Sequence, residues 1–140
     1  MQSPRENPMN FAAPPPLAEH NSNLLLAALP PHELAQILPL LDPVTVELGD
    51  VLCEAGDPLR HIYFPHDCLI SLMGVAEGRM TLEVGLVGRE GMVGATVALG
   101  HDTTQVRAIV QRAGSASRMD SSRFRAEVAR NPSLQRVVYR

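Results

Sequence analysis

A glycine-rich stretch in the second half of the chain most strongly limits what this sequence can fold into. It runs from Val84 to Gly100 and holds five of the ten glycines, at positions 85, 88, 91, 94 and 100. Residues 88–91 (GREG) read as a tight turn, because glycine reaches positive φ without a Cβ clash. Residues 95–99 have room for about one helical turn before Gly100 ends it. A strand, a turn and a short helix with free N–H groups form a candidate anion cradle.

The segments on both sides of this stretch have the alternating apolar pattern of short β-strands, with Gly- and Pro-containing turns between them. The expected strands cover residues 44–48, 51–53, 61–64, 68–75, 80–87, 105–113 and 115–119. Many short strands at regular spacing indicate a sandwich or barrel. The sequence therefore predicts a mainly β protein.

Helical patterns flank the strands. Apolar residues repeat at helical spacing over residues 32–41, which predicts an amphipathic helix. Pro31 suits its first turn, and Pro39 should tighten or kink its end. After the strands, Asp120 and Ser121 offer N-cap oxygens to a helix that ends at Asn131, before Pro132. A further short helix should begin at residue 133.

At 140 residues the chain fits one domain with a real core. Residues 1–22 contain five prolines and few large apolar side chains, so we expect a flexible arm there. We assign residues 23–131 to the β domain and 132–140 to the start of a last helix. No apolar run approaches the ~18 residues of a membrane span, and the N-terminus lacks a signal-peptide pattern. We expect a cytoplasmic protein that contacts no membrane.

Charge is distributed unevenly along the chain. Residues 1–102 carry 4 Arg and 13 acidic residues, a balance of −9, whereas residues 103–140 carry 8 Arg and 2 acidic residues, a balance of +6. Such arginines either form the solvated face of helices or approach an anionic partner. We expect salt-sensitive, sequence-independent attraction to DNA at most.

The sequence offers no motif for catalysis or for a metal. Its five histidines form no His-X-His pair, and Pro65 interrupts the segment between His61 and His66. The two cysteines, Cys53 and Cys68, suit small buried hydrophobes better than a metal site or disulfide framework. We therefore expect no enzyme activity, no metal and no cofactor.

The order of the elements, with local sequence, resembles the cyclic-nucleotide-binding sensor domain of Crp/Fnr-type transcription regulators. The matching motifs are LGDVL at 48–52, GDP at 56–58, IYF at 62–64, MVG at 92–94, Phe124 and Asn131-Pro132. The resemblance covers roughly residues 23 to 140. It implies an antiparallel β-roll, of the jelly-roll kind, with helices packed at one end, and a small-molecule effector site at the glycine-rich stretch.

The resemblance also assigns roles within that site, which we call the cassette. The candidate effector residues are Gly94, Ala95, Thr96, Thr103, Thr104 and Arg107. In relatives that bind cyclic nucleotides, a Glu follows the cassette glycine and an Arg at the far end pairs with the phosphate. Here Ala95 follows the glycine, the region of the arginine reads Thr-Thr-Gln, and Arg107 comes late in register. We expect the fold to persist with a different ligand or none, because losing a guanidinium–phosphate pair costs several kcal/mol.

Two functions follow from this resemblance. The first is an effector-sensing domain of a Crp/Fnr-type regulator, whose DNA contact needs a helix-turn-helix unit that nothing after Ser133 can supply. The alternative is a stand-alone β-roll for interaction or dimerisation that binds no ligand. In the resembled family the helix after Asn131-Pro132 forms the dimer seam. Its apolar residues here, Leu134, Val137 and Val138, bury little area, so we expect a monomer or weak homodimer.

Overall fold

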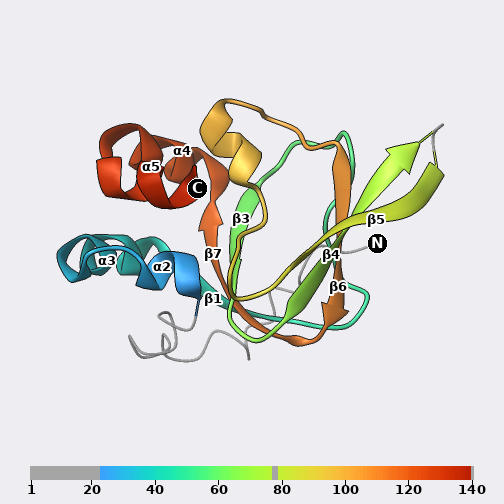
Figure 1. Ribbon diagram of the computed structural model, residues 1–140, viewed down its shortest axis with the longest axis horizontal. Coiled ribbons are helices and arrows are strands. Elements are labelled where there is room, and N and C mark those ends of the chain that lie inside the picture. The colour runs from blue at the N-terminus through green and yellow to red at the C-terminus, as the bar shows by residue number, and fades with distance from the viewer. Residues whose placement is uncertain (1–22, 77–78, 140) are drawn as a thin grey trace.

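The computed structural model describes residues 23–76 and 79–139, and in them seven antiparallel strands form two sheets with helices on one side (Figure 1). This arrangement confirms the expected β-roll with flanking helices. The three-stranded sheet has the order β1 (Asp42–Val46), β7 (Gly114–Asp120), β3 (His61–Pro65). The four-stranded sheet has the order β2 (Val51–Cys53), β6 (Val106–Arg112), β4 (Leu69–Ala76), β5 (Arg79–Val87).

The helices gather beside the three-stranded sheet, on the side away from β5 (Figure 1). They are α2 (Leu24–Ala27), α3 (Pro31–Ile37), α4 (Ser121–Arg130) and α5 (Pro132–Val138), with the 3-10 helices η2 (Leu38–Leu40) and η3 (Ala95–Leu99). The N-cap of α4 is Asp120, as expected, whereas α5 begins at Pro132, one residue before the expected start, with Asn131 as its N-cap. Asp120 accepts the Ser122 N–H, and Asn131 accepts the Leu134 N–H.

Alternation along the strands divides the core into two clusters, because successive side chains of a strand point to opposite faces. Ile62 and Phe64 of β3 join the helices in one cluster, and Tyr63 between them belongs to the cluster enclosed by the two sheets. In the helical cluster the rings of Phe64 and Phe124 meet edge to face, 6.2 Å apart. Leu134 and Val137 of α5 are buried in the same cluster, so these side chains pack on the domain's own core.

The first helical prediction differs from the structure at its end. Helix α3 stops at Ile37, and residues 38–40 continue as a 3-10 turn, in which Leu41 N donates to Leu38 O. Pro39 has no N–H and clashes with the preceding turn of an α-helix, which explains the tightening. The four-residue helix α2 was not expected from the sequence, since four residues carry too little periodicity to show a helix.

Asn23 fixes the position of α2. Its side chain is fully buried, and its Oδ1 accepts the N–H groups of Leu25 and Leu26. Its Nδ2 donates to the carbonyls of Pro65, 2.9 Å away, and Gly91, 3.0 Å away. One amide therefore caps a helix, contacts the end of β3 and holds the turn that precedes the cassette.

The turn at residues 88–91 forms, but not for the reason that the sequence suggested. Gly91 N donates to Gly88 O at 3.1 Å, whereas neither glycine adopts a positive φ. Close approach explains the glycine at 88, because a Cβ there would lie 3.0 Å from Leu69 Cδ2. The positive φ values belong to four glycines elsewhere among the described residues, at positions 49, 56, 94 and 100.

Candidate functional site

Gly94 is the fixed point of the cassette. Its φ of +104° lies in the left-handed region, and a Cβ there would lie only 2.7 Å from Ile62 Cδ1. The positive φ favours glycine, and a Cβ would in addition displace the Ile62 side chain. The preceding residue, Val93, exchanges two backbone hydrogen bonds with Tyr63 of β3, of 2.9 and 3.1 Å. The cassette is thereby held against the three-stranded sheet.

Helix η3 begins directly after Gly94. Val97 N donates to Gly94 O and Gly100 N donates to Val97 O, each at 3.0 Å, and Gly100 ends the helix with φ of +93°. Val97 anchors it in the helical core cluster. The expected single turn is confirmed, as a 3-10 turn.

A cavity of about 170 Å³ lies between the start of η3 and the four-stranded sheet. Side chains from β2, β4, β6 and the cassette form its wall. The lining residues are Cys53, Leu59, Leu72, Met92, Val93, Gly94, Ala95, Thr96, Thr104 and Val106. We call this space the cassette cavity. Its wall is largely apolar and includes no charged side chain among the described residues.

The structure brings together four of the six residues that the sequence put forward. Gly94, Ala95, Thr96 and Thr104 line the cassette cavity, and Thr103 does not. Thr103 is exposed and forms a β-bridge with Pro58.

Arg107 also lies outside the cassette cavity. It follows the lining residue Val106 on β6, so alternation turns its side chain to the other face, where it stands opposite Met73. Its Nε lies 3.0 Å from Glu54 Oε1, an ion pair without the alignment of a hydrogen bond. Its charge is thus engaged by a carboxylate.

Sequence reasoning missed six lining residues, and three of them, Cys53, Leu72 and Val106, come from the four-stranded sheet. Strand alternation marks Leu72 and Val106 as inward-facing, and that signal could have suggested them. Cys53 follows a register shift between β2 and β6, which no local pattern reveals.

The surroundings of Cys53 are acidic. Burial raises the pKa of its thiol most, and the carboxylates of Glu54 and Asp57 raise it further. The thiol is therefore neutral near pH 7. The same two carboxylates line a second hollow, of about 220 Å³, that shares Cys53 with the cassette cavity.

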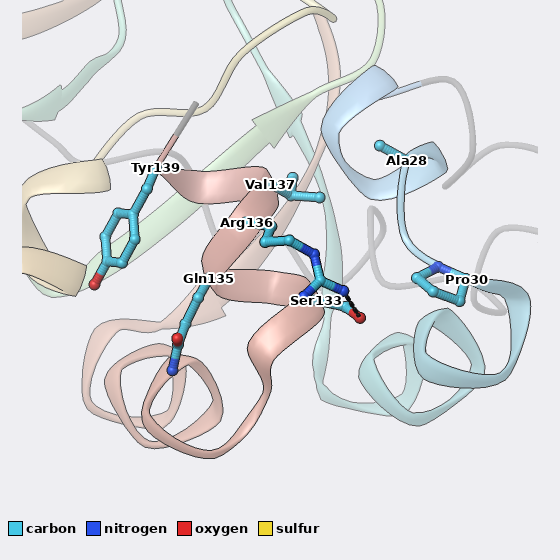
Figure 2. A pocket seen from close by; sticks show the side chains of 7 residues that line it. All are labelled: Ala28, Pro30, Ser133, Gln135, Arg136, Val137 and Tyr139. Carbon is cyan, nitrogen blue, oxygen red and sulfur yellow. Dashed lines mark hydrogen bonds between the residues drawn. The ribbon is translucent and has the colours of Figure 1, made fainter.

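Another hollow, of about 620 Å³, lies between α5 and the link that joins α2 to α3 (Figure 2). Ala28 and Pro30 stand on one side, and α5 contributes most of the other. The Arg136 guanidinium donates to Ser133 Oγ at 3.1 Å, so both polar groups bond within α5.

Polar contacts of Tyr139 and Arg125 connect the cassette to the C-terminal helices. The hydroxyl of Tyr139, just after α5, donates to the Ala98 carbonyl of η3 at 3.0 Å. Arg125 of α4 forms an exposed ion pair of 2.8 Å with Asp102, two residues after Gly100, the C-cap of η3. Displacement of η3 would therefore be felt at both helices.

The sequence matches one protein-family model, described as the cyclic nucleotide-binding domain, over residues 43–131. The chain belongs to the cyclic nucleotide-binding domain family. The cassette cavity of this member lies where η3 meets the sheet, within the matched residues.

Solved structures share the fold of this cyclic nucleotide-binding domain. A proposed cAMP-binding regulatory protein from Silicibacter pomeroyi DSS-3 is 19% identical, with a TM-score of 0.71 over 87% of this chain and 56% of its own. The N-terminal domain of a transcriptional regulator from Streptomyces coelicolor A3(2) is 19% identical, with a TM-score of 0.63 over 84% and 81%. The catabolite activator protein of Thermus thermophilus is 16% identical, with a TM-score of 0.68 over 82% and 54%.

The chain thus spans little more than half the length of two of these three proteins. Comparison with curated protein sequences gives no match. Within residues 23–76 and 79–139, no helix has the length and apolar character needed to cross a membrane.

Proposed function

We propose that this domain is the effector-sensing part of a cytoplasmic Crp/Fnr-type transcription regulator and carries out no catalysis. The observation that carries the proposal is the position of the cassette cavity at the start of η3. A ligand there touches Ala95 and Thr96, which open the helix, and Tyr139 ties the same helix to the end of α5. In such a regulator, DNA is read by a helix-turn-helix unit, which we assign to residues beyond those of this domain.

We further propose that the cassette is degenerate and that its effector is no cyclic nucleotide. Ala95 offers no acceptor for a ribose hydroxyl, and Arg107 is held by Glu54 outside the cavity. A phosphate placed in the cassette cavity would be buried without a cation, which costs several kcal/mol.

The test has two stages. Native mass spectrometry of the protein purified from its own cells should find a bound small molecule. Hydrogen exchange should then be measured with and without that molecule. Slower exchange in η3, α4 and α5 is expected, with the β1 amides as the internal reference. Binding that leaves exchange in η3 and both helices unchanged would refute the sensing function.

The second candidate is a stand-alone interaction module, and one observation favours it. Leu82, Val84 and Leu86 of the edge strand β5 are 64%, 55% and 49% exposed. Exposed apolar side chains on an edge strand are suited to pairing with another chain. Analytical ultracentrifugation separates the two readings, because the sensing proposal expects a monomer or weak homodimer from this chain. A tight dimer that Val84→Glu disrupts would favour the interaction module.

A further inference from the structure

The cassette cavity has the size and wall of a site for a small apolar molecule. Its volume is about 170 Å³, and Leu59, Leu72, Met92 and Val106 supply apolar side chains from separate segments. Apolar cavities of about 150 Å³ in other proteins accept benzene or xenon without holding ordered water. A nucleotide is larger than this space and carries a phosphate.

The carboxylates beside Cys53 oppose an anion at that end of the cavity, and the adjoining hollow that they line also holds Arg60. Arg107, the nearest cation that the sequence suggested, points away from the cavity and pairs with Glu54. Glu54 and Asp57 lie close enough to Cys53 to disfavour its thiolate, and a negative ligand beside Cys53 would meet the same repulsion. A positive ligand would find no carboxylate among the described lining residues.

Only a few polar groups face the cavity, and one of them is already half engaged. The Thr104 hydroxyl oxygen accepts the Val106 N–H at 3.3 Å, which leaves the hydroxyl proton to donate. Thr96, the other hydroxyl in the lining, is exposed at the rim. The wall can therefore bond one or two polar atoms of a ligand and cover the rest with carbon.

We infer that the effector of this domain is an uncharged, largely apolar small molecule, between benzene and indole in size, that binds in the cassette cavity. This inference rests on the proposed sensing function for its biological meaning, but binding itself is measured separately. Such a ligand would contact Leu72 of β4 and Ala95 of η3 together and so join the four-stranded sheet to η3.

Indole is the probe, and methyl NMR of protein labelled with [methyl-13C]methionine is the readout. Met92 lines the cavity and packs against the helical core cluster, and Met119, which is buried within that cluster and does not line the cavity, serves as the reference. We expect a saturable ring-current shift of the Met92 methyl, with Kd of about 1 mM or tighter. The Met119 methyl should not move, and Met92→Leu assigns the signal. Cyclic AMP should leave Met92 unmoved over the same range.

Filling the cavity supplies the matched control. Val106→Phe places a ring in the cavity and should weaken indole binding at least about tenfold. Val84→Phe makes the same exchange at an exposed position of β5 and should leave binding unchanged. If Val106→Phe fails to fold, Ala95→Val is the smaller filling variant and should also weaken binding. Equal binding by wild type and a folded filling variant would overturn the inference, as would a Met92 shift by cyclic AMP at lower concentration than by indole.

The two proposals fail in different ways. If indole binds but hydrogen exchange in η3 and α5 does not change, the sensing function is refuted, and the inference that the cavity binds uncharged apolar molecules stands. A charged cellular molecule found in the cavity, with altered exchange in η3 and α5, would refute the ligand class and keep sensing. No saturable shift of Met92 with indole would refute the ligand class directly.

Discussion

The hydroxyl of Tyr139 donates a 3.0 Å hydrogen bond to the carbonyl of Ala98. The two residues are 41 positions apart, and the bond joins the end of α5 to the helix that opens at the cassette cavity. With the Arg125–Asp102 ion pair and the packing of Val97 on α4 and α5, it links the candidate site to the C-terminal helices.

Removing this bond should uncouple the two elements at small cost to the fold. In Tyr139→Phe we expect the free energy of unfolding to fall by about 0.5–1 kcal/mol, because the ring is half exposed and water replaces the lost partner. Hydrogen exchange in η3 should accelerate, and the amides of β1 should exchange as in the wild type. Equal acceleration in β1 would mean global destabilisation and would contradict the local link.

Among the glycines of the cassette, Gly94 should lose the most unfolding free energy when it is replaced. Gly94→Ala combines a strained φ with a Cβ at 2.7 Å from Ile62 Cδ1, and we expect a loss of about 2–4 kcal/mol in denaturant unfolding. Gly56→Ala is the matched control, since its φ is +86° but no atom lies within 4 Å of its Cβ. Strain alone should cost about 1 kcal/mol there. Equal losses in the two variants would show that the contact with Ile62 relaxes.

Asn23 should contribute far more to the free energy of unfolding than an ordinary helix N-cap does. Asn23→Ala removes four hydrogen bonds of a buried side chain and strands the Pro65 and Gly91 carbonyls, so we expect a loss of about 3–4 kcal/mol. Asn131→Ala removes one cap bond, to Leu134 N, and should cost about 1 kcal/mol. Chemical denaturation of both variants measures the two losses in the free energy of unfolding. Similar losses would mean that the long-range bonds of Asn23 contribute nothing.

Asp67 should contribute stability that acid removes. The backbone N–H of Ser115 donates to its carboxylate and lowers the pKa of Asp67 in the folded protein. A lowered folded pKa means that the contribution is present above the unfolded value of about 3.9 and is lost as pH falls through the folded value. The Tm difference between wild type and Asp67→Asn should therefore shrink from pH 6 to pH 2.5. A difference that is constant over this range would contradict the assignment.

Cyclic nucleotides should bind no tighter than about millimolar, roughly −4 kcal/mol. Calorimetric titration with cyclic AMP and cyclic GMP checks this expectation, which follows from Ala95 and from the Arg107–Glu54 pair. Micromolar binding would mean that Arg107 leaves Glu54 for the phosphate. In that case Arg107→Ala should abolish the signal.

The strands and the cassette turn could be predicted because glycine and proline mark their ends. Gly94 and Gly100 delimit η3, and Pro65 ends β3, by local backbone chemistry alone. The wall of the cavity could not be predicted in the same way. Cys53 reaches it through the pairing of β2 with β6, which contains a register shift. The sequence does not predict helix α2, because Asn23 stabilises it through partners more than 40 residues away.

Because the backbone around Gly94 is held by hydrogen bonds to other segments, the side chains that line the cavity can change without changing the fold. Val93 is held by Tyr63 and the turn before it by Asn23, so the frame does not depend on which side chains face the cavity. Ala95, Thr104 and Val106 can then be substituted while the backbone keeps its structure. A library at these three positions, selected against labelled small molecules, should yield domains that bind different ligands on the same backbone.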